Sequence, residues 1–178
     1  MNQPLLIEID DAVAIISIND APFNRMTLEF IDQLEALVDK IAADDSIRAV
    51  VLTAQGLDNF SVGMNLKQLP EGIARAGSVD ALLDQRLRVI SAIETMHKPW
   101  VVTLFGYCLG GGLEVPLGCH FRLAATEEHK LASPKWTWAA FPPGVAVPGS
   151  ATASAVTALS IWFCEVKRFP VQKPCALA

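Results

Sequence analysis

Apolar and polar positions along the chain follow two periods, one typical of strands and one of helices. The run VAIISIN (13–19) is rich in β-branched residues and is bounded by Asp and Pro, which predicts a strand. RAVVLTAQG (48–56) and KPWVVTLFG (98–106) are nearly continuous apolar runs and predict further buried strands.

Longer segments between these runs carry the helical period. The helix predicted over 27–45 has Thr27 as its N-cap, and its apolar face consists of Ile31, Leu34, Val38 and Ile41. The helix predicted over 79–96 has an apolar face made of Leu83, Leu87, Ile90 and Ile93. Strands that alternate with helices indicate an α/β fold with a largely parallel sheet.

Composition narrows the function classes. The 178 residues fit one domain, and 52% hydrophobic with 19% charged residues is a globular composition. A net charge of −5 argues against a nucleic-acid surface, which needs clustered Lys and Arg. The longest apolar stretch, 101–119, contains three adjacent glycines and Glu114, so no membrane span is expected. The chain opens without a charged segment and apolar core typical of a leader, and a cytoplasmic location is expected.

The four cysteines form no CxxC pair and have no His partners at zinc spacing, so buried thiols and no metal site are expected.

The stretch GYCLGGGLEVPLGCH (106–120) has the most specific chemistry. Glycines between a strand and a helix bring backbone N–H groups to a helix N-terminus, where negative charge is favoured. A phosphate cradle fits poorly, because GxxxxGK[ST] and GxGxxG are absent and the acid Glu114 follows closely. An oxyanion hole beside a proton-transferring carboxylate fits better, while glycines that merely allow tight packing remain the alternative.

A resemblance to a known family favours the oxyanion hole over the packing alternative. HKPWVVTLFGYCLGGGLEVPLGCHFRLAA resembles the core signature of the crotonase (enoyl-CoA hydratase/isomerase) superfamily, a K-P-[apolar run]-G-x-x-x-G-G-G-x-E pattern before an apolar helix. IRAVVLTAQGLDNFSVGMNLKQL resembles the strand, loop and F-[SC]-x-G-x-D-[LI] turn, and NDAPFNRMTLEFIDQLEALVDKI the opening segment and its helix. These blocks cover residues 5–131 in the family's order.

The resemblance implies a ββα spiral that acts on acyl-CoA thioesters, with no cofactor beyond the coenzyme A of the substrate. In that family, backbone N–H groups hold the thioester oxygen and stabilise an enolate. Gly111 and Met64 fall on the positions of the donors, and Glu114 on the first catalytic glutamate. The matching substrate-binding positions are Phe23, Asn24, Met26, Ser61, Gly63, Leu66 and Gly110.

The chain departs from the family pattern at several positions. Asn65 stands where Asp is usual, and His120 replaces the Asp that often follows the cysteine. Neither position transfers protons in the family, so altered local hydrogen bonds are expected. Met64 in place of Ala keeps the N–H donor and narrows the pocket.

The second catalytic glutamate of the hydratases has no counterpart. The family's G-x-P-E loop aligns with LASPKWTW, where Pro134 is in register and Lys135 occupies the glutamate position. Up to Leu131 the chain has 18 acids and 10 bases, whereas from Ala132 it has one acid and four bases. Residues 1–131 are therefore interpreted as a crotonase-like core and 132–178 as an atypical tail.

The genetic code offers an explanation for the tail. Codons such as GCC-TCC-CCG-AAA-TGG-ACT-TGG-GCG-GCG-TTC would encode residues 132–141. Read one base earlier, from the last G of a CTG codon for Leu131, they would give G-L-P-E-M-D-L-G-G-V, which resembles the family's second catalytic loop. The same shift applied to SIWFCEVKRFPVQKPC permits D-[ML]-V-L-R-G-K-x-I-S-G-P-E-A-L, which resembles the family's next helix and turn. The hypothesis is a single-base deletion or sequencing error near Leu131, which leaves the tail out of frame.

The leading function from these residues is hydration of a trans-2-enoyl-CoA by the intact parent enzyme, with Glu114 and the frame-restored acid as a pair. The alternatives are an enoyl-CoA isomerase, which needs one base, and a non-catalytic fragment that binds CoA thioesters. The family's homotrimeric or hexameric assembly is doubtful for this chain, because the resemblance places the assembly helices in the part that is replaced. The substrate is the expected partner, with neither nucleic acid nor membrane.

Overall fold

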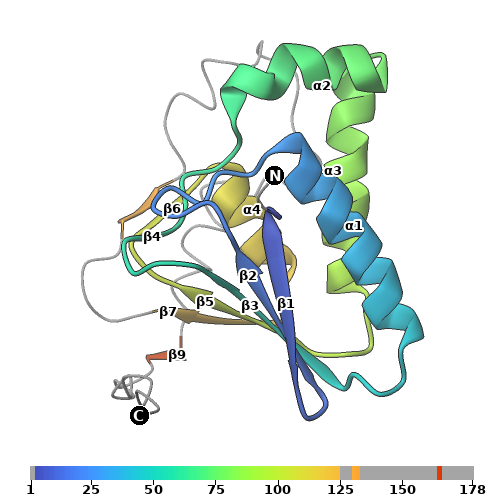
Figure 1. The fold of residues 1–178 in the computed structure, drawn as a ribbon, viewed down its shortest axis with the longest axis vertical. Helices are drawn as coiled ribbons and strands as arrows, with labels where there is room; N and C mark the ends of the chain where they lie inside the picture. The colour runs from blue at the N-terminus through green and yellow to red at the C-terminus, as the bar shows by residue number, and fades with distance from the viewer. Residues whose placement is uncertain (1–2, 125–129, 133–163, 166–178) are drawn as a thin grey trace, which may run out of the picture.

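The computed structural model describes residues 3–124, 130–132 and 164–165 (Figure 1). The strands are β1 (Leu5–Asp10), β2 (Val13–Ile18), β3 (Ala49–Ala54), β4 (Asn59–Ser61), β5 (Trp100–Leu104), β6 (Tyr107–Leu109), β7 (Phe121–Ala124), β8 (Lys130–Ala132) and β9 (Cys164–Glu165). The helices are α1 (Leu28–Ala43), the 3-10 turn η1 (Leu66–Gln68), α2 (Leu69–Ala76), α3 (Val79–Glu94) and α4 (Gly111–Gly118).

The described strands form two sheets. The larger has the order β1-β2-β3-β5-β7-β9, and the smaller has the order β4-β6-β8. β1 and β2 form an antiparallel hairpin, and all other described ladders are parallel. The predicted strands at 13–19, 48–56 and 98–106 correspond to β2, β3 and β5, so the α/β architecture with largely parallel pairing is confirmed.

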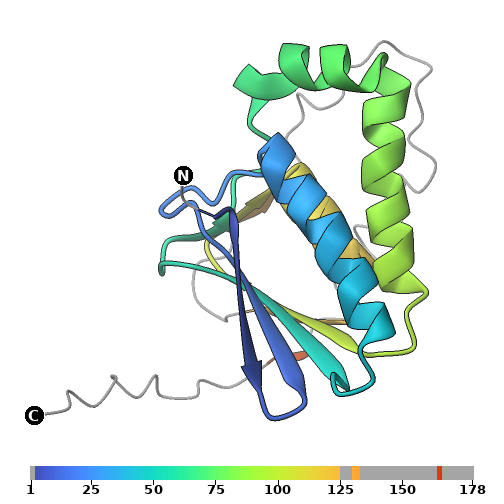
Figure 2. The ribbon, with the colours of Figure 1, turned by 45° about the vertical axis from the view of Figure 1, so that its right-hand side comes forward.

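Helices α1 and α3 lie on the same side of the larger sheet (Figure 2). On neighbouring strands of this sheet, the apolar residues Ile16 of β2, Leu52 of β3 and Val102 of β5 lie side by side and are each 0% exposed. Every second residue of a strand points to the same face, so these neighbouring positions form one continuous layer of the core. This layer fixes the ends of the parallel strands from which the site loops emerge.

Helix α1 begins as the sequence predicts. Thr27 is its N-cap, and the Thr27 hydroxyl accepts a hydrogen bond from the Phe30 N–H at 3.1 Å. All four residues of the predicted apolar face are buried. At the other end of α1, the Lys98 ammonium donates to the Ile41, Ala42 and Asp44 carbonyl oxygens. A cation there satisfies carbonyls that lack a partner within the helix and complements the helix dipole.

Helix α3 is confirmed, but its buried face differs from the predicted one. Leu82, Val89 and Ile93 are its buried residues, whereas Leu83 and Leu87 are only partly buried. The reason is that α3 packs against α1 and α2: Leu82 lies against Gly72 of α2, and the Gln85 amide donates to carboxylates on α1. The face that is most apolar in sequence is therefore rotated from the face that meets the core.

Within the described ranges, every helix is too short or too polar to cross a membrane. The predicted boundary at residue 131 falls inside β8, and β9 lies within the predicted tail. Lys135 and the rest of that tail, 133–163 and 166–178, lie outside the described residues.

Candidate active site

The glycine run forms the junction between β6 and α4. Gly110 adopts a φ of +52°, which side chains rarely tolerate, and it serves as the N-cap of α4. The Gly110 carbonyl accepts hydrogen bonds from the N–H groups of Leu113 and Glu114 at 2.8 and 3.1 Å. Gly111 opens the helix, so its N–H belongs to the first turn, where helix N–H groups have no partner within the helix.

A second glycine turn meets this junction from β4. Gly63 has a φ of +92°, and a Cβ built on it would lie 2.5 Å from the Leu109 carbonyl oxygen and 3.6 Å from the Gly111 nitrogen. A Cβ built on Gly111 would lie 4.0 Å from the Met64 nitrogen. The backbones of the two turns are therefore in direct contact, which only glycine at position 63 permits.

This contact brings the backbone nitrogens of Gly111 and Met64 close together. The Met26 N–H donates to the Gly63 carbonyl at 2.9 Å, and the Asn65 N–H donates to the Met26 carbonyl at 2.9 Å. These two bonds flank Met64 and do not use its N–H. Within the described part of the chain, neither Met64 nor Gly111 uses its N–H in a hydrogen bond. Two adjacent free donors can hold one oxygen that carries developing negative charge.

Asn24 and Ser61 hold the turn in place from inside the protein, where both are 0% exposed. The Asn24 amide donates to the Gln55 and Asn59 carbonyls, each at 2.8 Å. The Ser61 hydroxyl donates to the Asn24 carbonyl at 2.6 Å and accepts from the Gly63 N–H at 3.1 Å. Their side chains therefore support the turn at Gly63 and do not lie on its surface.

Gly112 brings α4 onto the same support. A Cβ built on Gly112 would lie 2.7 Å from the Ser61 carbonyl oxygen and 2.8 Å from the Ser61 Cβ. The three adjacent glycines thus have separate roles: a positive φ at Gly110, an accessible donor at Gly111, and a close backbone approach at Gly112.

Glu114 projects from the first turn of α4 toward the two donors. Its Oε2 atom lies 3.9 Å from the position a Cβ would occupy on Gly111. Glu114 is exposed to solvent at its accessible surface, and the protein atoms around its carboxyl group displace enough water to raise its pKa. The positive charge of Arg86 on α3 acts in the opposite direction and lowers this pKa. A carboxyl group whose pKa lies above the ordinary glutamate value is suited to exchange protons near neutral pH.

The remaining predicted binding residues differ in exposure. Phe23 and Leu66 are 51% and 57% exposed, while Met26 is 6% exposed and its sulfur would lie 3.6 Å from a Cβ on Gly111. The Arg25 guanidinium lies over the Phe23 ring, 5.8 Å from its centroid. The structure therefore brings Met26, Gly63 and Gly110 to the catalytic candidates and leaves Phe23 and Leu66 as exposed apolar side chains on the flanking segments.

The two departures from the family pattern have local structural roles. The Asn65 side chain caps η1, where its Oδ1 atom accepts from the Lys67 N–H at 3.3 Å. The His120 Nδ1 atom accepts a hydrogen bond from the Trp100 N–H at 3.0 Å, which ties the end of α4 to the start of β5. Both positions thus form hydrogen bonds of their own within the fold.

Burial makes the thiols of Cys108 and Cys119 unreactive. Cys108 and Cys119 are buried and free, and burial raises the pKa of each thiol to about 12. A thiol that stays protonated is a poor nucleophile. Among the described residues, no three His, Cys, Asp or Glu side chains gather closely enough to hold a metal ion.

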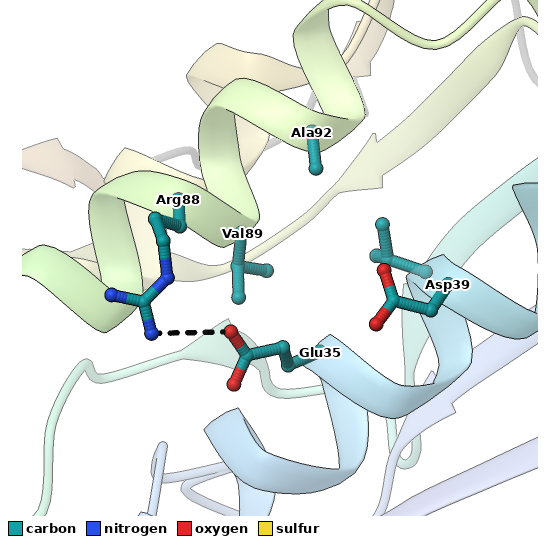
Figure 3. A pocket seen from close by; sticks show the side chains of 6 residues that line it. Glu35, Asp39, Arg88, Val89 and Ala92 are labelled. Atoms are coloured by element: carbon teal, nitrogen blue, oxygen red, sulfur yellow. Dashed lines mark hydrogen bonds and ion pairs between the residues drawn. The ribbon is translucent and has the colours of Figure 1, made fainter.

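A hollow of about 230 Å³ lies elsewhere, between α1 and α3 (Figure 3). Its polar lining consists of Glu35 and Asp39 from α1 and Arg88 from α3, and Arg88 pairs with Glu35 at 3.4 Å. It contains none of the site residues. We therefore assign the candidate site to the backbone contact between Gly63-Met64 and Gly111, together with Glu114.

Arg86 is the site residue that the sequence predictions missed. Its position gave a signal, because Arg86 lies three residues after Leu83 and four before Ile90 and so interrupts the predicted apolar face of α3.

This site lies in a crotonase fold, and the chain belongs to the enoyl-CoA hydratase/isomerase family, whose family model matches residues 13–147. The match confirms the resemblance and extends past the predicted boundary at residue 131.

Individual relatives agree. A probable enoyl-CoA hydratase of Bacillus subtilis is 29% identical over 130 residues, which are 72% of this chain and 49% of that protein. The fatty acid oxidation complex subunit alpha of Shewanella oneidensis is 33% identical over 121 residues, 66% of this chain and 17% of that protein. The chain thus spans about half or less of the curated relatives it matches.

Solved structures give the same fold. An enoyl-CoA hydratase from Bacillus anthracis matches with a TM-score of 0.60 and 28% identity, over 69% of this chain and 48% of that one. A Geobacillus kaustophilus structure described as an enoyl-CoA hydratase gives a TM-score of 0.66 at 25% identity, over 78% of this chain and 52% of the other.

Proposed function

We propose that this site binds an acyl-CoA thioester and stabilises its enolate. The thioester oxygen would accept hydrogen bonds from the N–H groups of Gly111 and Met64. The observation that carries the proposal is the direct contact of the two glycine turns, with both N–H groups free within the described structure. Coenzyme A arrives as part of the substrate, and the chemistry needs no further cofactor.

The second requirement is a proton carrier next to the carbonyl. Polarising a thioester carbonyl acidifies its α-carbon, because negative charge that forms there is shared with the oxygen. The Glu114 carboxylate lies within reach of this position, on the first turn of the helix that donates the Gly111 N–H. The same element therefore supplies an oxyanion donor and a base.

Hydration of a trans-2-enoyl-CoA is the reaction we assign to a chain with a second acid at position 135. Glu114 would take a proton from water as the hydroxyl oxygen bonds to C3, and the resulting enolate would take a proton at C2 from the second acid. In the sequence as written this position is Lys135, so we expect hydration to be very slow.

Isomerisation is the second candidate, and it is favoured if the tail is genuine, because the written chain then has Glu114 without a second catalytic acid. Glu114 would remove a C2 proton from a 3-enoyl-CoA and return it at C4, which shifts the double bond to C2–C3 without a second acid. The two reactions are separated by assaying the protein with crotonyl-CoA and with a 3-enoyl-CoA. Rapid hydration of crotonyl-CoA would contradict the assignment of Lys135 to the second-acid position.

The binding proposal is tested by removing one donor without removing the helix. Gly111→Pro deletes the N–H at a helix position that tolerates proline, while Gly111→Ala keeps it and adds a methyl group with ordinary contacts of 3.6–4.0 Å. In calorimetric titrations with butyryl-CoA, we expect Gly111→Pro to bind about tenfold more weakly than Gly111→Ala, the effect of one lost hydrogen bond.

Circular dichroism controls for folding of both variants, and free coenzyme A controls for contacts outside the thioester. Equal affinities of the two folded variants for butyryl-CoA would refute the role of the Gly111 N–H.

A further inference from the structure

Arg86 is an arginine that the proposed reaction does not use. Within the described residues, Arg25 and Arg75 form ion pairs, Arg88 pairs with Glu35, and Arg122 donates to the carbonyls at the end of α4. Arg86 is half-buried in α3, and no hydrogen bond or ion pair joins it to another described residue. Burial of a charged group without a partner is costly, so a compensating interaction is expected.

Arg86 and Glu114 lie on two helices, α3 and α4, that pack against each other. A Cβ on Gly118 would lie 2.8 Å from the Ile90 Cγ2 atom and 3.0 Å from the Ile90 carbonyl oxygen, so the two helices touch here almost backbone to backbone. Arg86 lies four residues before Ile90, and Glu114 lies four residues before Gly118. Each charged residue is therefore one helical turn from the same contact, on the face of its helix that meets the other.

Electrostatics agrees with this geometry. Burial lowers the pKa of Arg86 and the Glu114 charge raises it, while burial raises the pKa of Glu114 and the Arg86 charge lowers it. The two charges thus act on each other across the interface.

Other charged groups around α4 do not have this position. α4 packs against α3, β4 and β6. β4 contributes no ionisable side chain, and β6 contributes Tyr107 and the Cys108 thiol, which stays neutral because burial raises its pKa to about 12. Arg122 lies at the opposite end of α4, bound to its last carbonyls. Arg88, two residues along α3, is paired with α1.

We propose that Arg86 is a positioning residue for Glu114: the packing of α3 on α4 sets its guanidinium opposite the carboxylate, where it keeps Glu114 ionised and able to accept a proton. The proposal rests on the proposed function of Glu114 as a base. It explains why a guanidinium is half-buried without a hydrogen-bond partner among the described residues, and it assigns α3 a part in the chemistry of α4.

The direct test is the titration of Glu114 in the free protein, followed by NMR of ¹³C-carboxyl-labelled glutamate, with Glu114→Gln to identify the resonance. We expect Arg86→Gln to shift the Glu114 midpoint to higher pH and Arg86→Lys, which keeps the charge, to shift it less. The matched control is Arg88→Gln, which removes the same charge two residues away on the face toward α1 and should leave the midpoint unchanged.

The result that overturns the proposal is a Glu114 midpoint that Arg86→Gln leaves where it is, or that Arg88→Gln moves equally. A binding comparison of glutaryl-CoA with butyryl-CoA distinguishes a second role for Arg86. In one outcome, Arg86→Gln leaves the Glu114 midpoint unchanged and weakens binding of glutaryl-CoA relative to butyryl-CoA. Arg86 would then be a receptor for an acyl carboxylate, and the positioning role would be wrong. Because the titration uses no substrate, its outcome is independent of whether the site binds acyl-CoA.

Discussion

At Gly63 the chain passes so close to β6 that the absence of a side chain is a condition for the site. Gly77, at the end of α2, offers a matched comparison, since it also has a positive φ, +85° against +92°, but a Cβ there would meet no atom within 4 Å. Replacement by alanine therefore puts a side chain on a positive φ at both positions, and it causes a steric overlap only at Gly63.

We expect Gly77→Ala to lower the free energy of unfolding by about 1 kcal/mol and Gly63→Ala by at least about 2 kcal/mol more. Urea unfolding measures both. Gly63→Ala should also lose butyryl-CoA binding, because the Met64 N–H moves away from Gly111. Equal losses of stability in the two variants would contradict the close approach of the turns.

Glu114 makes a prediction about stability and pH. Burial raises the pKa of Glu114, so the folded protein binds this proton more tightly than the unfolded chain does. The ionised carboxylate therefore destabilises the fold above the raised pKa, and the effect disappears below the ordinary glutamate pKa. Glu114→Gln removes the charge and keeps the shape. Thermal unfolding should show Glu114→Gln to be more stable than the natural chain at about pH 8 and equal to it at about pH 4.

A glutamine variant that is less stable at the higher pH would show that Glu114 is stabilised as an anion by the fold. The higher stability expected for Glu114→Gln also agrees with the proposed function of Glu114, since a group that weakens the fold but supports chemistry is typical of an active site.

On the scale of single elements, α1 depends on its first and last turns. The Thr27 hydroxyl satisfies the Phe30 N–H at 3.1 Å. Thr27→Ala should lower the free energy of unfolding by about 1 kcal/mol, and Thr27→Ser, which keeps the hydroxyl, should stay close to the natural chain. Guanidinium unfolding of the two variants checks this, and an alanine variant as stable as the serine variant would contradict the cap.

Sequence patterns predicted the buried central strands and the long helices, and they missed the exposed edge strand β1 and the shortest strands. β2, β3 and β5 are central strands buried by neighbours, so their apolar runs are long enough to be recognised. β1 was not predicted, because it is an edge strand in which Ile7 and Ile9 remain 40% and 52% exposed and a polar residue separates them. β4 and β6 have three residues each, and a strand of that length depends on its partner and has no period of its own.

The candidate site also has residues that the sequence predicts and one that it does not. The glycine run and Glu114 were predictable from the sequence, since glycines that open a helix and a carboxylate in its first turn are together typical of an oxyanion site. Arg86 was not predicted, because its role depends on how α3 rotates against α1 and α4, and this rotation also made the predicted buried face of α3 wrong. Helix packing angles are a tertiary property that periodicity leaves open.

For the whole molecule, the out-of-frame tail remains a prediction that the gene decides. Sequencing through codons 125–140 should give CCG at Pro134, AAA at Lys135 and TGG at Trp136, so that reading one base earlier yields Glu (GAA) followed by Met (ATG). An AAG codon at Lys135 would yield Val in place of Met in the shifted frame and contradict the hypothesis. Resequencing from an independent clone distinguishes a deletion in the gene from an error in the reading.

The hydrogen-bond pattern around Met64 has a consequence for amide exchange. The N–H groups of Met26, Gly63 and Asn65 are all bonded, while those of Met64 and Gly111 are free within the described structure. Deuterium should therefore enter at Met64 and Gly111 well before it enters at the residues around Met64. A bound thioester oxygen would slow exchange at these two amides together, although they are far apart in the sequence. Slower amide exchange at both Met64 and Gly111 would thus indicate that one substrate oxygen binds the two turns together.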